Sequence, residues 1–388
     1  VYIDSYLNHQ SAYSFAVSAA NVQADWIMRD RKLMDGLRRV DTSWDAIWYS
    51  EVQITPEGWT VEMEIPYTML RFPEAESMRW GINFQREIAR LGEVNDWIFI
   101  PRSANEFVAN FGILTGLKGV EPQRNLQVSP YTLSRMTAQP TPSKTRDYSR
   151  GIEAGADVKF GISSSITADA TLNPDFGQVE SDPAILNLTT YETFFPEKRP
   201  FFLEGVDIFD FSFPDEDGSL LYTRRIGGSN SPIIGALKLS GRTQGDYSFG
   251  ILSAATGQDY SPGRYYGAGR VRRDFGRTSY LGGMVTGYHR NASTRLARET
   301  VAGGVDWDLR FGNQAYQFKG FAVGSHRATG QQSSNTGLGF SGVLGNVAGH
   351  FTYSAGVRGY DEQFQANDVG WLRENDFLRT EVIWQQLL

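Results

Sequence analysis

The stretch that decides the fold runs from Thr171 to Phe213 and reads TLNPDFGQVESDPAILNLTTYETFFPEKRPFFLEGVDIFDFSF. On both sides of it the chain alternates apolar and polar residues as β-strands do, but within it this alternation stops. Its eight phenylalanines are too much apolar surface to leave in water. We therefore expect this Phe-rich segment to pack inside a container that the rest of the chain supplies.

The sequence after residue 151 predicts that container as a series of antiparallel hairpins. Gly-Asn and other turn dipeptides separate runs in which apolar and polar residues alternate. Together with a strand predicted at Leu126–Met136, the runs make about twelve strands. In Thr300–Phe311, for example, Val301 and Val305 share one face, and Asp306 lies on the other. The predicted pairs are Gly151–Phe160 with Ser163–Thr171, Ile233–Ser240 with Tyr247–Ala255, Tyr265–Arg273 with Ser279–His289, Thr300–Phe311 with Ala315–Gly324, and Gly337–Leu344 with Gly349–Tyr360, and the last strand is Phe377–Leu387.

These strands have the length and spacing of a membrane barrel. Strands of about 10 residues cross a bilayer when they are tilted. Short turns alternate with long polar connections at 256–264, 290–299 and 325–336, which is typical of transmembrane barrels. A large soluble β protein, such as a propeller, is the alternative, and the absence of a fixed repeat disfavours it. Because a barrel leaves no bare strand edge in lipid, more chain or another copy is expected to complete it.

Residues 1–118 predict a separate small β domain, read as a sandwich of short strands. The chain opens as if in mid-strand, which suggests a processed or truncated start. After this domain we expect a strand at Leu126–Met136 and a polar loop at Thr137–Arg150. The strands predicted for the small domain are Ser14–Val17, Trp44–Ile54, Gly58–Ile65, Trp80–Ile88, Asp96–Ile100 and Phe111–Leu117.

Composition excludes several classes of function. A net charge of −7 argues against a nucleic-acid partner, which a basic domain would favour. The absence of cysteine excludes thiolate catalysis, Cys-ligated zinc and disulfides. The sequence has neither a run of about 18 apolar residues nor a visible signal peptide. It also lacks a nucleophile elbow, a Walker loop and HExxH.

The run DFGQVESDPAILNLTTYETFFPEKRPFFLEG resembles the hallmark of a bacterial outer-membrane barrel family catalogued as domain of unknown function 5916. The resemblance continues through LYTRRIG at 221–227 and GALKLSG at 235–241. In that family a domain similar to carbohydrate-binding module family 9 precedes the barrel, and WDAIW at 44–48 and GWTVEMEIP at 58–66 resemble it. The resemblance implies location and architecture but no activity.

The Phe-rich segment is itself predicted to contain a helix over Ala184–Phe195, because Asp182-Pro183 is a good helix start and Pro196 stops it. Buried charges need partners. Charged residues in and after the segment are therefore expected to pair with each other or with the lumen, as a plug that selects solutes or only braces the wall, and we favour bracing. These residues are Asp175, Glu180, Glu192, Glu197, Lys198, Arg199, Glu204, Arg224 and Arg225.

Tryptophans of the small domain are candidates for stacking on sugar rings, although several are expected in its core. They are Trp26, Trp44, Trp48, Trp59 and Trp97. No cofactor is expected, and the alternative is a calcium ion in the small domain with oxygen ligands from Asp25, Asp30, Asp41 and Asp45. The sequence assigns no metal-ligand set.

Taken together, the sequence predicts an all-β protein with a periplasmic β-sandwich at 1–118 and an outer-membrane barrel at 119–388, plugged by 172–213. It would bind or pass a solute, with a carbohydrate as one candidate, and its partners would be outer-membrane lipid, a glycan or another envelope protein. A scaffold barrel that docks a partner is one alternative. The other is an envelope glycan hydrolase, for which two carboxyl groups about 5 to 9.5 Å apart are needed; its candidates are Asp175, Glu180, Asp182, Glu192, Glu197 and Glu204.

Overall fold

The computed structural model describes the whole chain except residues 33–37, 43, 45, 74, 101–105, 121–125, 141–145, 175–185, 215–217, 228–230, 244, 259–260, 277, 291–296, 331–332 and 387–388. The described chain is all-β with antiparallel sheets, as predicted, and its one α-helix there is the single turn α1 (Pro200–Leu203). No helix in the described ranges is long and apolar enough to span a membrane.

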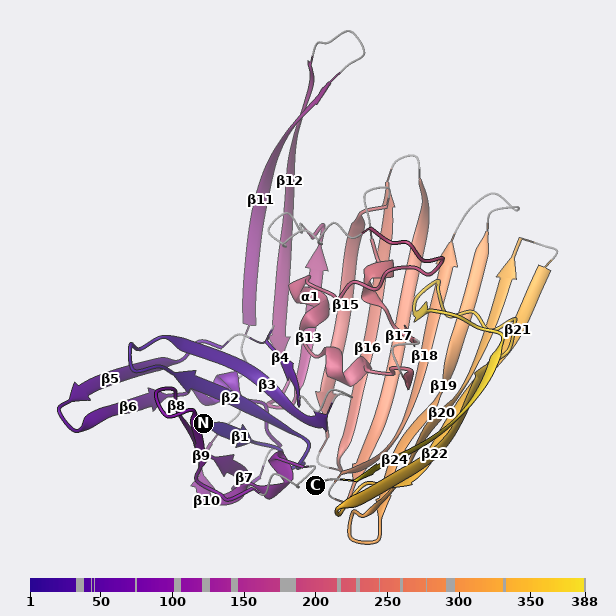
Figure 1. Cartoon of the computed structure of the whole chain (residues 1–388). Helices are drawn as coiled ribbons and strands as arrows, with labels where there is room; N and C mark the ends of the chain where they lie inside the picture. Colours follow the sequence, from indigo (N-terminus) through magenta and orange to yellow (C-terminus); the bar gives the residue numbers. More distant parts are fainter. Residues whose placement is uncertain are drawn as a thin grey trace.

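A curved sheet of twelve antiparallel strands dominates the molecule (Figure 1). Each strand pairs with the next along the chain, and the sheet is open, with β11 and β24 at its edges. The strand number and every predicted hairpin of the sequence are found in it. Its strands are β11 (Leu126–Pro140), β12 (Arg146–Gly161), β13 (Ile166–Leu172), β15 (Ile233–Arg242), β16 (Tyr247–Gln258), β17 (Ser261–Phe275), β18 (Ser279–Arg290), β19 (Arg298–Phe311), β20 (Tyr316–Thr329), β21 (Ser333–Asn346), β22 (Phe351–Tyr360) and β24 (Phe377–Gln386).

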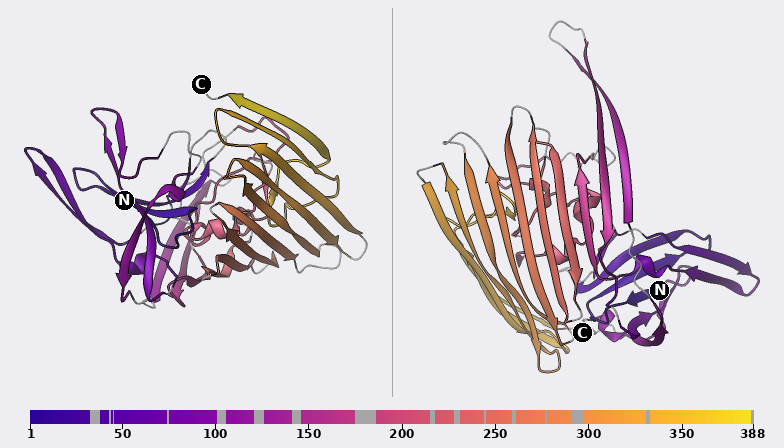
Figure 2. Two further views of the ribbon diagram at one scale, coloured as in Figure 1. Left: turned by 90° about the horizontal axis from the view of Figure 1, so that it is seen from below. Right: turned by 180° about the vertical axis from the view of Figure 1, so that it is seen from behind.

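The two faces of this sheet differ in chemistry. On the convex face, apolar side chains are exposed, among them Leu237 at 63 % and Leu338 at 64 %. On the concave face, charged side chains are buried, among them Lys238 at 4 % and Arg270 at 2 %. Figure 2 shows the convex face bare of other elements, while the chain between β13 and β15 lies on the concave side. Successive side chains along a β-strand point to opposite faces of the sheet, so the exposed apolar residues and the buried charged residues lie on different faces.

The strands extend further than the alternation predicted. β11 and β12 pair up to Pro140↔Arg146, so most of the predicted loop at 137–150 is strand. β16 and β17 likewise pair across much of 256–264, and β20 and β21 pair across much of 325–336. The ends of these strands are polar and do not alternate apolar with polar residues, although their backbones still pair. The sequence pattern therefore did not predict them as strand.

Two long connections leave the sheet on its concave side, 173–232 between β13 and β15 and 361–376 between β22 and β24. They meet there. β14 (Gly218–Ser219) of the first pairs with β23 (Trp371–Leu372) of the second, and Tyr222 N donates to Val369 O at 2.9 Å. The second connection was not predicted as an internal element.

The small domain is built on a six-stranded sheet with two separate hairpins, β5–β6 and β8–β9. Both faces of the sheet are covered: Ile3 packs with Phe15, Trp48 and Trp80 on one face, and Tyr2 packs with Phe107 on the other. Its strands are β1 (Tyr2–Asp4), β2 (Ser11–Val17), β3 (Gln23–Lys32), β4 (Arg38–Asp41), β5 (Tyr49–Thr55), β6 (Gly58–Glu64), β7 (Ser77–Asn83), β8 (Gln85–Ile88), β9 (Glu93–Asp96) and β10 (Gly112–Lys118). Its 3-10 turns are η1 (Tyr67–Met69) and η2 (Val108–Asn110).

Two strand predictions in this domain were wrong. The described residues of 44–48 turn Trp44 and Trp48 into the core but pair with no neighbouring strand, so the strand begins only at Tyr49. Residues 97–100 are not strand either, because the Asn83 side chain takes the Ile98 N–H at 3.1 Å, where a ladder partner would be.

The small domain sits at the end of the large sheet where the connections are short turns (Figure 1). Phe72 N donates to Ser164 O at 3.3 Å, in the turn between β12 and β13. The Arg272 guanidinium on β17 bonds the Gln10 side chain. The two long connections therefore leave and rejoin the strands at the opposite end of the sheet from the small domain, although residues around Glu204 in the first connection reach back to it.

Candidate functional site

The Phe-rich segment lies against the concave face of the large sheet. Phe202, Phe209, Phe211 and Phe213 are all buried, and the Phe213 ring lies 5.0 Å from that of Phe321 on β20. The concave face of the sheet therefore provides the packing surface that the sequence predicted for the Phe-rich segment. The expected burial is confirmed for these four phenylalanines.

The helix predicted over 184–195 was wrong for the residues that the structure describes. Residues 186–199 form no helix, and α1 follows only at Pro200. The Asn187 side chain accepts the Thr189 N–H at 2.9 Å and donates to Tyr191 O at 2.6 Å. Such local side-chain bonds offer the backbone an alternative to helix. Asp182, Pro183 and the first two residues of the predicted helix, Ala184 and Ile185, lie outside the described residues.

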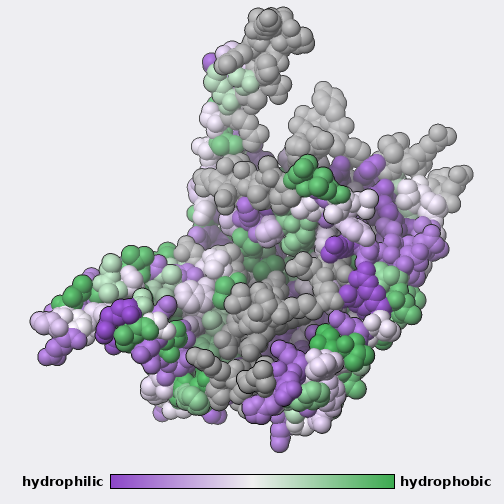
Figure 3. Space-filling model, in the orientation of Figure 1, coloured by the Kyte–Doolittle hydropathy of each residue, from purple (hydrophilic) through white to green (hydrophobic). Residues whose placement is uncertain are grey.

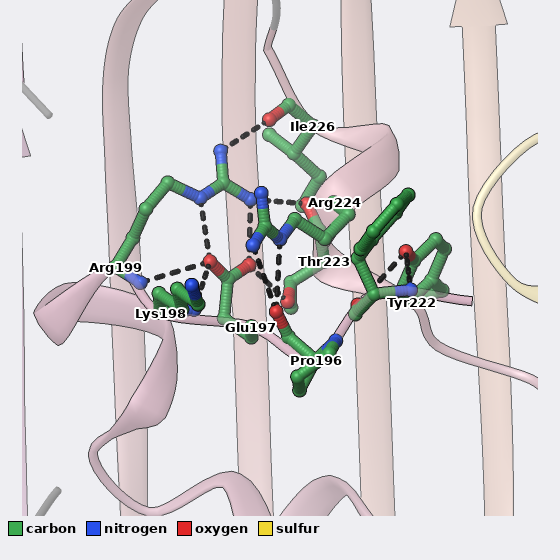
Figure 4. A network of polar contacts seen from close by, with 9 residues as sticks. Pro196, Glu197, Lys198, Arg199, Tyr222, Thr223, Arg224 and Ile226 are labelled. Atoms are coloured by element: carbon green, nitrogen blue, oxygen red, sulfur yellow. Dashed lines mark hydrogen bonds and ion pairs between the residues drawn. The ribbon is translucent and has the colours of Figure 1, made fainter. Parts of the chain in front are cut away.

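Glu197 and Arg199 form a buried ion pair that organises the segment (Figure 4). Arg199 Nε and Nη2 each lie 2.7 Å from a Glu197 carboxylate oxygen, and the same guanidinium donates to Ile226 O and Thr223 O at 2.6 Å. The Thr223 hydroxyl donates to Glu197 as well. Burial alone would raise the pKa of Glu197, but the hydrogen bonds and charge of Arg199 outweigh it and lower this pKa.

Glu204 ties the segment to both the sheet and the small domain. Its carboxylate lies 2.6 Å from Lys159 Nζ on β12 and 3.0 Å from Arg71 of the small domain. Lys238 Nζ on β15 donates to the backbone carbonyls of Phe201 and Glu204 at 2.6 and 2.8 Å. Burial opposes ionisation of Glu204, yet the three nearby cations hold its pKa below the usual value.

The remaining predicted charges that the structure describes lie on the first long connection, 173–232. Arg225 makes two bonds to the Glu192 carboxylate, at 2.9 and 2.6 Å, and donates to Gly370 O at 3.2 Å. The Arg224 guanidinium donates to Pro196 O, and Lys198 N donates to Glu197. Asp175 and Glu180 lie outside the described residues. The described charges are thus brought together with partners, while their role in selecting a solute stays a prediction.

Sequence reasoning missed Asp368, on the connection 361–376. Its carboxylate lies 3.0 Å from Arg298 and 3.4 Å from Arg327, and it accepts the Thr300 hydroxyl at 2.6 Å. These three residues face inward on β19 and β20. The same signal that marked the Phe-rich segment, a break in alternation between two strands, was present here on a smaller scale.

Of the carboxyl groups considered for hydrolysis, the structure describes Glu192, Glu197 and Glu204. Each of these three contacts an arginine. A general acid of a glycosidase needs a raised pKa, whereas the pKa values of Glu197 and Glu204 are lowered. These two residues therefore suit fixed anchoring better than proton donation.

The five candidate tryptophans are spread over the small domain. Trp48 is 5 % exposed and donates from Nε1 to Asp25 at 2.9 Å, and Trp44 packs on Tyr13 with ring centroids 4.9 Å apart, so both belong to the core. Trp26 is half-buried beside Tyr2.

The other two tryptophans are more accessible. Trp59 is half-buried under Arg86, whose guanidinium lies 5.9 Å from the ring. Trp97 is 62 % exposed and stands edge-on to Phe84 at 5.7 Å, next to the exposed Phe99. Trp97 has the access that stacking on a sugar requires. The ligand role of all five stays a prediction.

Most of the aspartates considered as calcium ligands have side chains outside the described residues. Asp25 bonds Trp48, whereas the side chains of Asp30 and Asp41 and the whole of Asp45 are outside the described residues. Within the described ranges, no three His, Cys, Asp or Glu residues gather as a metal-binding group.

A cavity of about 80 Å³ lies between the small domain and the large sheet. It is lined by Tyr6, Tyr13 and Arg71 from the small domain, and by Glu204 and Arg242 from beyond it. Burial raises the pKa values of the Tyr6 and Tyr13 phenols, so both stay neutral donors. The Arg242 guanidinium lies 5.4 Å from the Tyr6 ring centroid.

Comparison with known proteins gives a family and little else. No curated protein and no solved structure matches the chain. A family model described as "Domain of unknown function (DUF5916)" matches residues 122–233 and 270–386, which include most of the large sheet, the described Phe-rich segment and the connection 361–376. Because these two stretches cover more than half of the sequence, the chain belongs to the DUF5916 family.

Proposed function

We propose that the twelve-stranded sheet is wall of a β-barrel in the bacterial outer membrane, and that this barrel binds or passes a solute. The observation that carries the proposal is the polarity of the sheet. Its convex face exposes apolar side chains on strand after strand, such as Leu237, Leu281, Val301 and Leu338, all more than half exposed. A soluble β protein buries such a face, whereas a barrel turns it to lipid.

The concave face supports the same proposal. It buries charges in pairs, such as Arg270 with Asp306 at 2.7 Å, as expected of a polar barrel interior. Strands β15 to β22 run 10 to 15 residues, enough to cross the hydrocarbon core when tilted. In a bilayer the edges of β11 and β24 need partners, so we propose that further strands pair with them there.

The Phe-rich segment would then be a plug, because it lies against the inner face and is anchored to it through Glu204. The small domain would face the periplasm, because it sits at the short-turn end and short turns are periplasmic in such barrels. Its exposed aromatic surface around Trp97 and Phe99 is our candidate for the glycan contact. Hydrolysis has less support, since the described candidate carboxylates contact arginines.

Single cysteines test the membrane proposal directly, because the sequence has none of its own. We would place a nitroxide label at Leu281→Cys on the convex face, and at Thr60→Cys on the exposed side of β6 as the control, in protein reconstituted into phospholipid vesicles. Oxygen, which concentrates in lipid, should relax the label at 281 far more than a water-soluble nickel chelate does, and the label at 60 should show the reverse. Equal, nickel-dominated relaxation at both sites would refute insertion.

A further inference from the structure

Four arginines gather on the concave face at the long-connection end of the sheet. Arg264 on β17 continues the inward row of Tyr266, Ala268 and Arg270, which are all buried. The same spacing of two places Arg290 of β18 after Tyr288, and Arg298 of β19 before Thr300, on this face. Figure 3 shows hydrophilic residues gathered in this upper part of the concave side.

The strand register makes these arginines neighbours. Arg264 stands directly opposite Arg290, and Arg290 stands directly opposite Arg298. Arg327 on β20 faces Thr300, two residues from Arg298 on the same face, and both arginines contact Asp368. Like charges directly opposite each other on a sheet are destabilising unless something neutralises them.

Neutralisation by the protein is incomplete among the described residues. In the part of the chain that the structure describes, Asp368 is the carboxylate that contacts two of the four arginines. It already forms ion pairs with Arg298 and Arg327 and accepts a hydrogen bond from the Thr300 hydroxyl. Arg264 bonds the Tyr266 hydroxyl, and no described carboxylate contacts Arg264 or Arg290. The buried Nε atoms of all four arginines donate no hydrogen bond. Buried donors of this kind call for an acceptor.

We propose that Arg264, Arg290, Arg298 and Arg327 form a binding site for an oxyanion, a phosphate, sulfate or carboxylate group carried by the solute. Guanidinium groups match such anions through paired donors. Asp368 acts as a built-in counter-charge that the anion competes with. This inference rests on the proposed function, because it identifies the solute that the barrel binds or passes as an anion, which enters at the long-connection end of the sheet.

Inorganic phosphate is the probe that tests the site, by isothermal titration of the purified chain in lipid-free detergent so that lipid phosphates are absent. Arg264→Gln with Arg290→Gln should weaken phosphate binding about tenfold or more, since each removes a charge-assisted donor. Arg273→Gln is the matched control, because this exposed arginine lies on the other face of β17, and its binding should equal that of the wild type. Titrations with sulfate and acetate separate tetrahedral anions from carboxylates.

Asp368→Asn guards against misfolded variants, because it should tighten phosphate binding by freeing Arg298 and Arg327, and misfolding cannot do that. Phosphate affinity unchanged in the double arginine variant, or not increased by Asp368→Asn, overturns the site. Conductance in planar bilayers separates the two proposals. Phosphate binding without conductance supports the site and removes solute passage, whereas conductance insensitive to both phosphate and the arginine variants supports passage and overturns the site.

Discussion

Buried charge is neutralised differently at different residues of this chain. The Glu197–Arg199 pair satisfies both partners with side chains and backbone carbonyls. Asp4 of the small domain, which is 1 % exposed, instead accepts backbone N–H groups from Asn8 at 3.1 Å and His9 at 2.8 Å. Desolvation dominates there and raises the pKa of Asp4 to about 6, although the backbone bonds and the more distant Arg242 charge oppose it.

Asp4 should therefore make the small domain less stable as pH rises. Its folded pKa of about 6 lies above the ordinary value of 3.8, so its contribution is fully present below about pH 4 and is lost as pH rises through 6. The loss should reach about 3 kcal/mol, at 1.36 kcal/mol per pKa unit. Guanidinium unfolding followed by tryptophan fluorescence between pH 4 and 7 measures it. An Asp4→Asn variant should lose this slope, and an unaltered slope in the variant would contradict the assignment.

At the scale of elements, two connections do similar work on the concave face. The Phe-rich segment and the connection 361–376 pair through β14 and β23, and the ring of Phe364 stacks on Tyr360 at 5.5 Å. Sequence alternation predicted the strands because one face is continuously apolar. It predicted burial of the Phe-rich segment from its phenylalanines, but it gave 361–376 no separate role, since that stretch is short and has few aromatics.

Phe364 should matter more to stability than an aromatic of the convex face. Phe364 is completely buried, so Phe364→Ala should cost about 3 to 5 kcal/mol through lost burial and a cavity. Phe340→Ala on β21 is the matched control, since Phe340 is 45 % exposed on the convex face and should lose much less. Guanidinium midpoints in detergent measure both. Equal losses in the two variants would show that 361–376 does not pack as described.

At the scale of the whole molecule, the small domain is joined to the large sheet by polar contacts around a cavity. Neither Arg71 nor Gln10 drew notice in the sequence, because a single charged or polar side chain that has a distant partner leaves the same local pattern as a solvated one. Their partners, Glu204 and Arg272, lie 133 and 262 residues away in the chain. Pairing at such separations follows from the tertiary arrangement and leaves no local pattern, so this interface could not be predicted.

The interface should open when these contacts are removed. Arg71→Ala with Gln10→Ala deletes bonds to Glu204 and Arg272, each worth about 1 to 3 kcal/mol when a charged group is involved. Nitroxide labels at Thr60→Cys and Leu281→Cys report the distance between the small domain and β18 by pulsed electron resonance. The otherwise native protein should give one narrow distance distribution, and the double variant a broader one with longer distances.

Arg79→Ala is the control for this prediction, because Arg79 is exposed on β7 of the small domain and forms none of these contacts. It should leave the distance distribution narrow. A distribution that stays narrow in the Arg71→Ala, Gln10→Ala variant would mean that apolar packing or the Phe72 N to Ser164 O bond holds the domain in place without the ion pair. In that case Glu204 would serve the large sheet alone, through Lys159, and the small domain would have no mechanical connection to the Phe-rich segment through Arg71.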